Sequence, residues 1–145
     1  MKQKFLDYFM KLAEITADLS TATRLKVGTV IVRNNQILAT GYNGTPSGWD
    51  NVCEDVVWHS DGTRTTKTKP IVIHSESNAL TKIARSTETS ENATLFCTHA
   101  PCLDCAKLIY QSGISSVYYR NTYRETTGIE FLKQSGVKVE RHSIE

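Results

Sequence analysis

Two short patterns hold the side chains that could carry chemistry: His74-Ser75-Glu76 and, further along the chain, Pro101-Cys102-Leu103-Asp104-Cys105. Alone, Cys102 and Cys105 fit a redox pair, half of a structural zinc site, two ligands of a catalytic metal, or two core residues. In a helix, positions i and i+3 share one face, so both sulfurs can reach one ion. The unpaired amides and the dipole of a helix N-terminus favour thiolates there. The remaining ligands must therefore decide what this pair does.

His74 is the best candidate for the third ligand. A neutral imidazole and two thiolates leave the fourth tetrahedral position of zinc to water, whose pKa a catalytic zinc lowers toward ~7. A structural zinc needs a fourth protein ligand, and the other two cysteines stand alone in the sequence. Glu76 then remains free to take and return protons. H-x-E followed by P-C-x-x-C is the signature of zinc nucleobase deaminases.

The two other cysteines are assigned to other environments. Cys97 stands in the apolar run "ATLFCT", which predicts a packed core position. Cys53 follows "GWDN", which favours a solvent-facing loop thiol, with an auxiliary metal shared with His59 as the alternative. Four cysteines without an export signal are typical of a reducing compartment, so we expect a cytoplasmic location.

The hydrophobic pattern predicts one α/β domain over residues 1–145, with helices on both faces of a sheet. The Asn34-Asn35 pair predicts the turn of a hairpin. Residues 41–70 lack a sustained period and are expected to form a long irregular loop. The expected helices are 3–19, 74–85, 101–113 and 128–136, and the expected strands are 27–33, 36–40, 93–98, 116–120 and 137–141.

Composition excludes several classes of function. A hydrophobic fraction of 39% and a charged fraction of 22% are those of a globular protein, and the apolar stretches are interrupted by charges, so no membrane span is expected. The net charge of +2 is too small for a nucleic-acid binder but is compatible with an anionic small substrate.

Longer stretches extend the zinc signature: "KVGTVIV", "GYNGTPSG", "HSESNAL", "PCLDCAKLIYQSGISSVYY" and "SGVKV". With them the chain resembles the deoxycytidylate deaminases of the zinc-dependent cytidine deaminase superfamily, of the phage or bacterial type. The resemblance implies a three-layer α/β/α sandwich around a five-stranded mixed sheet, and a homo-oligomer, often a hexamer. It implies hydrolysis of dCMP to dUMP and ammonia, which supplies dUMP for dTMP synthesis. It further implies activation by dCTP with Mg²⁺ and inhibition by dTTP.

The resemblance also implies roles for individual residues. His74, Cys102 and Cys105 match the zinc ligands, and Glu76 matches the residue that carries protons. Ser75 stands where the family usually has alanine, and its backbone can still contribute to substrate binding.

The remaining substrate contacts have alternatives. Asn43 matches a residue that holds the sugar hydroxyl, although an Asn beside glycines is also typical of a left-handed turn. Tyr123 matches an aromatic near the pyrimidine or its sugar, the alternative being a half-exposed loop tyrosine. Arg24 and Lys26 would meet a phosphate or form a solvated face. His99 is unusual before "APC" and would line the pocket or contact solvent.

A second nucleotide site is expected near the Gly-rich turn, whose exposed amides would cradle a triphosphate. Its candidate residues are Gly41, Tyr42, Asn43, Gly44 and Lys26. Two rival functions stay open at this point. One is a zinc deaminase acting on another cytosine or adenine substrate, and the other is a zinc module that senses nucleotides without turnover.

Overall fold

The computed structural model describes residues 1–144, which form a five-stranded sheet, four helices and a separate two-stranded hairpin. The strands of the main sheet lie in the order β2-β1-β5-β6-β7. The elements are α1 (Gln3–Ala17), β1 (Gly28–Arg33), β2 (Gln36–Tyr42), β3 (Glu54–Trp58), β4 (Arg64–Thr68), α2 (Ser75–Ala84), β5 (Thr94–His99), α3 (Leu103–Gln111), β6 (Ser116–Asn121), α4 (Thr127–Gln134) and β7 (Lys138–Arg141).

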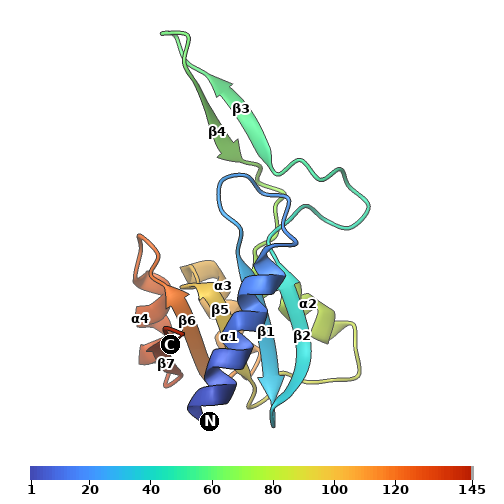
Figure 1. The fold of residues 1–145 in the computed structure, drawn as a ribbon, viewed down its shortest axis with the longest axis vertical. Helices are drawn as coiled ribbons and strands as arrows, with labels where there is room; N and C mark the ends of the chain where they lie inside the picture. Colours follow the sequence, from blue (N-terminus) through green and yellow to red (C-terminus); the bar gives the residue numbers. More distant parts are fainter. Residues whose placement is uncertain (145) are drawn as a thin grey trace.

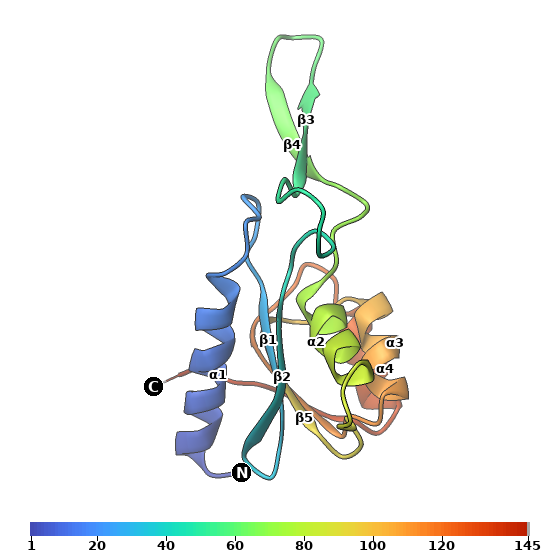
Figure 2. The ribbon, with the colours of Figure 1, turned by 90° about the vertical axis from the view of Figure 1, so that its right-hand side faces the viewer.

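The sheet is mixed and lies between two helical layers. β1 pairs antiparallel with β2 and β5, whereas β5, β6 and β7 run parallel to one another. Helix α1 covers one face, and α2, α3 and α4 cover the other (Figures 1 and 2). The expected three-layer α/β/α sandwich with a five-stranded mixed sheet is therefore confirmed. No helix within residues 1–144 is both long enough and apolar enough to cross a bilayer.

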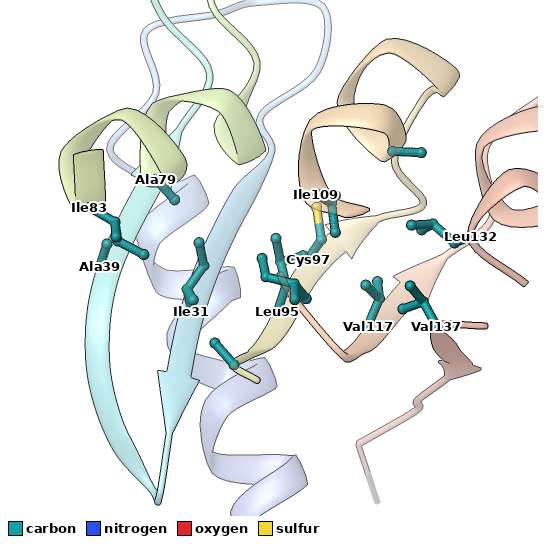
Figure 3. Close-up of a cluster of buried hydrophobic side chains, with 13 residues drawn as sticks. Ile31, Ala39, Ala79, Ile83, Leu95, Cys97, Ile109, Val117, Leu132 and Val137 are labelled. Atoms are coloured by element: carbon teal, nitrogen blue, oxygen red, sulfur yellow. The ribbon is translucent and has the colours of Figure 1, made fainter. Parts of the chain in front are cut away.

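Alternating side chains of the central strands build a separate core on each face of the sheet. Ile31, Leu95 and Val117 point toward α2, α3 and α4, as Figure 3 shows. Their neighbours Val30 and Phe96 point the other way and pack with Phe9 and Met10 of α1. Because both faces of the sheet are covered, the sequences of β1 and β5 are nearly continuous apolar runs. Such runs made the positions of these two strands predictable from the sequence.

The hairpin turn at Asn34-Asn35 is confirmed. Both residues have positive φ, 52° and 61°, and Arg33 pairs with Gln36 across a two-residue loop. Positive φ at both central positions matches the right-handed twist of the flanking strands, and Asn tolerates this conformation better than most residues.

The prediction of one irregular loop over residues 41–70 is wrong. β2 continues to Tyr42, Gly44 pairs with Ile73, and residues 54–68 form the hairpin β3–β4, which projects away from the sandwich (Figure 1). The β-branched and aromatic run of β3 and the threonines of β4 favour strands. Between them Asp61 accepts a hydrogen bond from the Thr63 amide and Gly62 has φ 84°, so "SDG" was an overlooked turn signal.

Strand β2 approaches helix α2 so closely that Gly41 has no room for a side chain. A Cβ at Gly41 would lie 2.6 Å from the backbone nitrogen of Ala79 and would also collide with the Ser75 carbonyl oxygen. The contact fixes the depth of α2 on the sheet, and His74 and Glu76 stand at the start of that helix. Gly41 is therefore explained by packing rather than by phosphate binding.

Gly41→Ala should lower the free energy of unfolding by at least about 1–3 kcal/mol, because the collision is with rigid backbone. Gly44→Ala is the matched control, since the nearest atom to a Cβ there lies 3.8 Å away on the Tyr42 ring. Urea unfolding at constant protein concentration measures both. Equal stabilities of the two variants would contradict this account of Gly41.

Candidate active site

Three predicted metal ligands converge at one end of the sheet. The Nδ1 atom of His74 lies 3.5 Å from the Cys102 Sγ and 3.3 Å from the Cys105 Sγ. Ideal zinc–nitrogen and zinc–sulfur bonds at a tetrahedral angle would separate N and S by about 3.6 Å. One imidazole and two sulfurs at this spacing fit zinc. Within residues 1–144 this is the one His, Cys, Asp or Glu cluster compact enough to hold a metal.

Two helix starts bring these side chains together. His74 is the N-cap residue of α2, and Cys102 is the N-cap residue of α3, both with extended backbone. Cys105 follows in the first turn of α3. Both sulfurs therefore lie at the positive end of a helix dipole, as the sequence predicted.

Close contact between the two thiols makes them share protons unequally. Hydrogen bonds from Cys105 and then from His74 lower the pKa of Cys102 to about 4. The hydrogen bond to Cys102 and burial raise the pKa of Cys105 far above its usual range. The pKa of His74 is raised, chiefly by its hydrogen bond to Cys102. Without a metal the pair thus holds one thiolate and one thiol, and a bound cation would have to displace the remaining proton.

Glu76 lies beside this cluster, and one oxygen of its carboxylate accepts hydrogen bonds from two buried side chains. The residue is 4% exposed, and its Oε1 accepts hydrogen bonds from the Ser75 Oγ at 2.5 Å and the Cys97 Sγ at 3.0 Å. Cys97 is fully buried, which confirms the core prediction, and burial raises the pKa of its thiol so that it stays a donor. The sequence pattern did not show that Cys97 also touches Glu76.

A cavity of about 390 Å³ opens in front of the metal cluster. Its volume is that of a small-molecule site. Seven of the residues predicted for the site line it: His74, Ser75, Glu76, Cys102, Asn43, Arg24 and Tyr123. Cys105 is buried and does not line the cavity. The cavity thus joins the metal donors, the carboxylate and one of the predicted phosphate contacts.

Four other candidate residues lie outside this cavity, and three of them were expected only at the second nucleotide site. Lys26 is exposed and does not line it, and neither do Gly41, Tyr42 and Gly44. The Asn43 amide donates to the Val27 carbonyl oxygen, and the Gly44 amide donates to the Ile73 carbonyl oxygen. The expectation that this turn offers exposed amides is therefore wrong for both residues, because pairing between neighbouring strands already uses them.

Asn43 does line the cavity, and its side chain has a structural task. Its Oδ1 accepts from the Val27 amide at 2.8 Å, and its Nδ2 donates to the Leu25 carbonyl oxygen at 2.7 Å. Its φ is not positive, so the alternative of a left-handed turn is wrong. Asn43 therefore holds the segment that carries Arg24 along the cavity wall.

Cys53 is not the solvent-facing thiol that the sequence predicted. It is 1% exposed and its Sγ lies 3.5 Å from the Thr21 Oγ1, because the loops before β1 and β3 pack against each other. His59 instead has its Nε2 atom 2.8 Å from the Thr65 Oγ1 in the hairpin. Within residues 1–144, Cys53 and His59 belong to no group of three or more potential metal ligands.

Sequence reasoning missed two features of the site. Arg124 lines the cavity next to Tyr123, and its position after a strand that ends at the site was the available signal. Gly128, in the first turn of α4, packs against the Cys102 backbone, where a Cβ would lie 2.8 Å from the Cys102 carbonyl carbon. His99, left open by the sequence, lines the cavity, and burial lowers its pKa, which favours the neutral ring.

The mixed sheet, the paired helix starts and the His/Cys/Cys set with an adjacent glutamate are those of zinc-dependent deaminase domains. The protein-family model named cytidine and deoxycytidylate deaminase zinc-binding region matches residues 3–121 of this chain. The chain belongs to this family.

Named relatives agree with the assignment. The chain is 38% identical to the deoxycytidylate deaminase of Saccharomyces cerevisiae over 99% of its own length and 46% of the relative. It is 34% identical to ComE operon protein 2 of Bacillus subtilis, and the match covers 95% of this chain and 71% of the relative. The chain thus spans about half the length of the yeast relative.

Among solved structures, the chain is similar to the dCMP deaminase of cyanophage S-TIM5 in complex with dCMP and dUMP. The sequence identity is 48%, the TM-score is 0.87, and the match covers 98% of this chain and 99% of the phage protein.

The purified protein should hold about one zinc per chain, and Cys102→Ala or Cys105→Ala should lose both metal and stability, because two thiolates carry the binding. Metal analysis after dialysis and thermal unfolding measure the two effects. Cys53→Ala is the control and should keep its zinc. Full zinc occupancy in the Cys102→Ala, Cys105→Ala double variant would show that the metal lies elsewhere.

Proposed function

We propose that this protein hydrolyses dCMP to dUMP and ammonia with a catalytic zinc held by His74, Cys102 and Cys105. The observation that carries the proposal is the position of Glu76: it lies beside the metal donors, it faces the cavity, and it is not one of them. The similarity to the cyanophage dCMP deaminase supports the choice of substrate.

We assign water activation to the bound zinc and the proton transfers to Glu76. When bound, zinc supplies a Lewis acid that makes water a nucleophile near neutral pH. Glu76 takes a proton from the attacking water and delivers it to N3 of the pyrimidine as the oxygen adds to C4. The same carboxylate then carries the second proton to the amine at C4, which leaves as ammonia. Burial of Glu76 keeps this shuttle out of bulk water.

The cavity wall supplies contacts for the rest of the nucleotide. Arg24 and Arg124 are the two arginines of the wall, so we assign the 5′-phosphate to them, since guanidinium groups bind phosphate through paired N–H donors. Asn43 and Tyr123 are assigned to the sugar and base, and the backbone of Ser75 to the base. The neutral His99 ring lies on the same wall without adding charge.

The projecting hairpin favours an oligomer, for which we propose the hexamer of the resembling family. A two-stranded hairpin is marginal in water by itself. Apolar side chains on or beside it are exposed, including Trp58 at 69%, Val56 and Trp49. A second copy of the chain would cover them.

Regulation by dCTP with Mg²⁺ and by dTTP is part of the same proposal. Because the amides of Asn43 and Gly44 are already paired, the effector phosphates would have to meet side chains such as Lys26. All four cysteines are free, which fits action in a reducing cytoplasm.

Glu76→Gln should keep zinc and dCMP affinity while turnover falls by about two or more orders of magnitude, because the amide cannot carry the proton. Ammonia release is measured with dCMP, dCTP, cytidine and a cytosine-containing oligonucleotide, alongside metal content and dCMP binding. Preference of the unmodified protein for dCMP supports the assignment. Turnover of the oligonucleotide instead of dCMP would overturn the substrate, and zinc loss in Glu76→Gln would make Glu76 a ligand.

Plots of rate against dCMP concentration should be sigmoidal, steeper with dTTP and closer to hyperbolic with dCTP and Mg²⁺, because each effector would favour a different oligomer conformation. Light scattering on the same preparations gives the oligomer mass, expected to be that of a hexamer. Hyperbolic curves that neither triphosphate changes would remove regulation from the proposal and leave the chemistry intact.

A further inference from the structure

Three protonated side chains from three different elements meet behind the Glu76 carboxylate. They are Ser75 at the start of α2, Thr29 on β1 and Cys97 on β5. All three are buried, at 0% exposed. Thr29 and Cys97 do not line the cavity, so neither is placed to contact a substrate in it. Their shared feature is the oxygen atom toward which they converge, Oε1 of Glu76.

The distances define one consistent assignment of the three protons. The Thr29 Oγ1 lies 2.8 Å from the Ser75 Oγ, which in turn lies 2.5 Å from Oε1 of Glu76. The Cys97 Sγ reaches the same oxygen at 3.0 Å, whereas the Thr29 Oγ1 lies 3.4 Å from it. Thr29 therefore donates to Ser75, and both Ser75 and Cys97 donate to Glu76.

The register between β1 and β5 places Thr29 and Cys97 side by side near Glu76. Thr29 and Cys97 are directly paired in the antiparallel ladder between β1 and β5, so their side chains stand next to each other on one face of the sheet. The first turn of α2 rests on that face, at the depth set by Gly41 of β2. Donors and acceptor are thus attached to rigid elements rather than to loops.

We infer that Cys97 and Ser75 are positioning residues for Glu76, which fix its Oε1 atom so that the other carboxylate oxygen is the one that carries the proton. Thr29 acts one step further back by orienting the Ser75 hydroxyl. The inference rests on the proposed function of Glu76 as proton carrier. An isolated carboxylate can rotate and exchange its oxygens, whereas two donors on one oxygen hold a single orientation.

The competing explanation is that Cys97 and Ser75 only fill space. Cys97 belongs to the core between the sheet and helices α2, α3 and α4, where any change of volume would disturb packing. Variants must therefore remove the donor while keeping the bulk, and the measurements must separate orientation of Glu76 from stability.

The test compares Cys97→Val, which keeps the bulk without a donor, with Cys97→Ser, which keeps a donor, and with Ser75→Ala. Cys97→Val and Ser75→Ala should each lower kcat on dCMP about 10- to 100-fold, the range found when supporting partners of a site are removed. KM and zinc content should stay unchanged, and Cys97→Ser should retain more turnover than Cys97→Val. Ser90→Ala removes another buried hydroxyl, which donates to the Ser112 carbonyl oxygen, and should leave kcat unchanged.

Each change is then combined with Glu76→Gln. Positioning residues act only through Glu76, so Cys97→Val and Ser75→Ala should cause no further loss in that background. Equal losses with and without Glu76, or an unchanged kcat in both single variants, would overturn the inference.

A readout without substrate separates this result from a failure of the proposed function. The infrared carboxylate bands of Glu76, taken as the difference between each protein and its Glu76→Gln counterpart, should shift in Cys97→Val and Ser75→Ala but not in Ser90→Ala. Shifted bands in a protein that deaminates no substrate would refute the function alone. Unshifted bands would refute the positioning.

Discussion

The site depends on the meeting of two helix starts at one end of the sheet. His74 and Cys102 are the N-cap residues of α2 and α3, so both candidate ligands lie where the backbone enters a helix, and Cys105 lies in the first turn of α3. This arrangement gives the sulfurs the positive ends of helix dipoles and sets Glu76 beside them. The cavity, its lining and the hydrogen bonds behind Glu76 all take their position from it.

Close backbone contacts hold those two helices in place. Gly41 lets β2 touch α2, and Gly128 lets α4 touch the Cys102 backbone, in each case where a Cβ would collide. The mixed sheet then ties both contacts to one core, since β1 and β5 pair directly. A site that needs sub-ångström placement of donors is thus supported by rigid elements rather than by the mobile ends of long side chains.

Different hydrogen bonds stabilise the charges of the metal donors and of the Glu76 carboxylate. Hydrogen bonds from Cys105 and His74 lower the pKa of the Cys102 thiol, whereas Glu76 receives neutral donors from Ser75 and Cys97. Two neutral hydrogen-bond donors therefore stabilise the Glu76 carboxylate. In the proposed function, this holds the base close to the metal donors without making it a ligand.

The sequence by itself determined the order of the main elements and predicted the candidate zinc ligands and the candidate proton carrier. These depend on local spacing: i and i+3 in a helix, two positions in H-x-E, and apolar runs in buried strands. Tertiary structure alone decided what depends on contacts between distant segments. The burial of Cys53, the pairing of the Asn43 and Gly44 amides, and the contact of Cys97 with Glu76 all join residues that are far apart in the sequence. Strand register and helix depth set these contacts, and neither is a property of any short stretch of sequence.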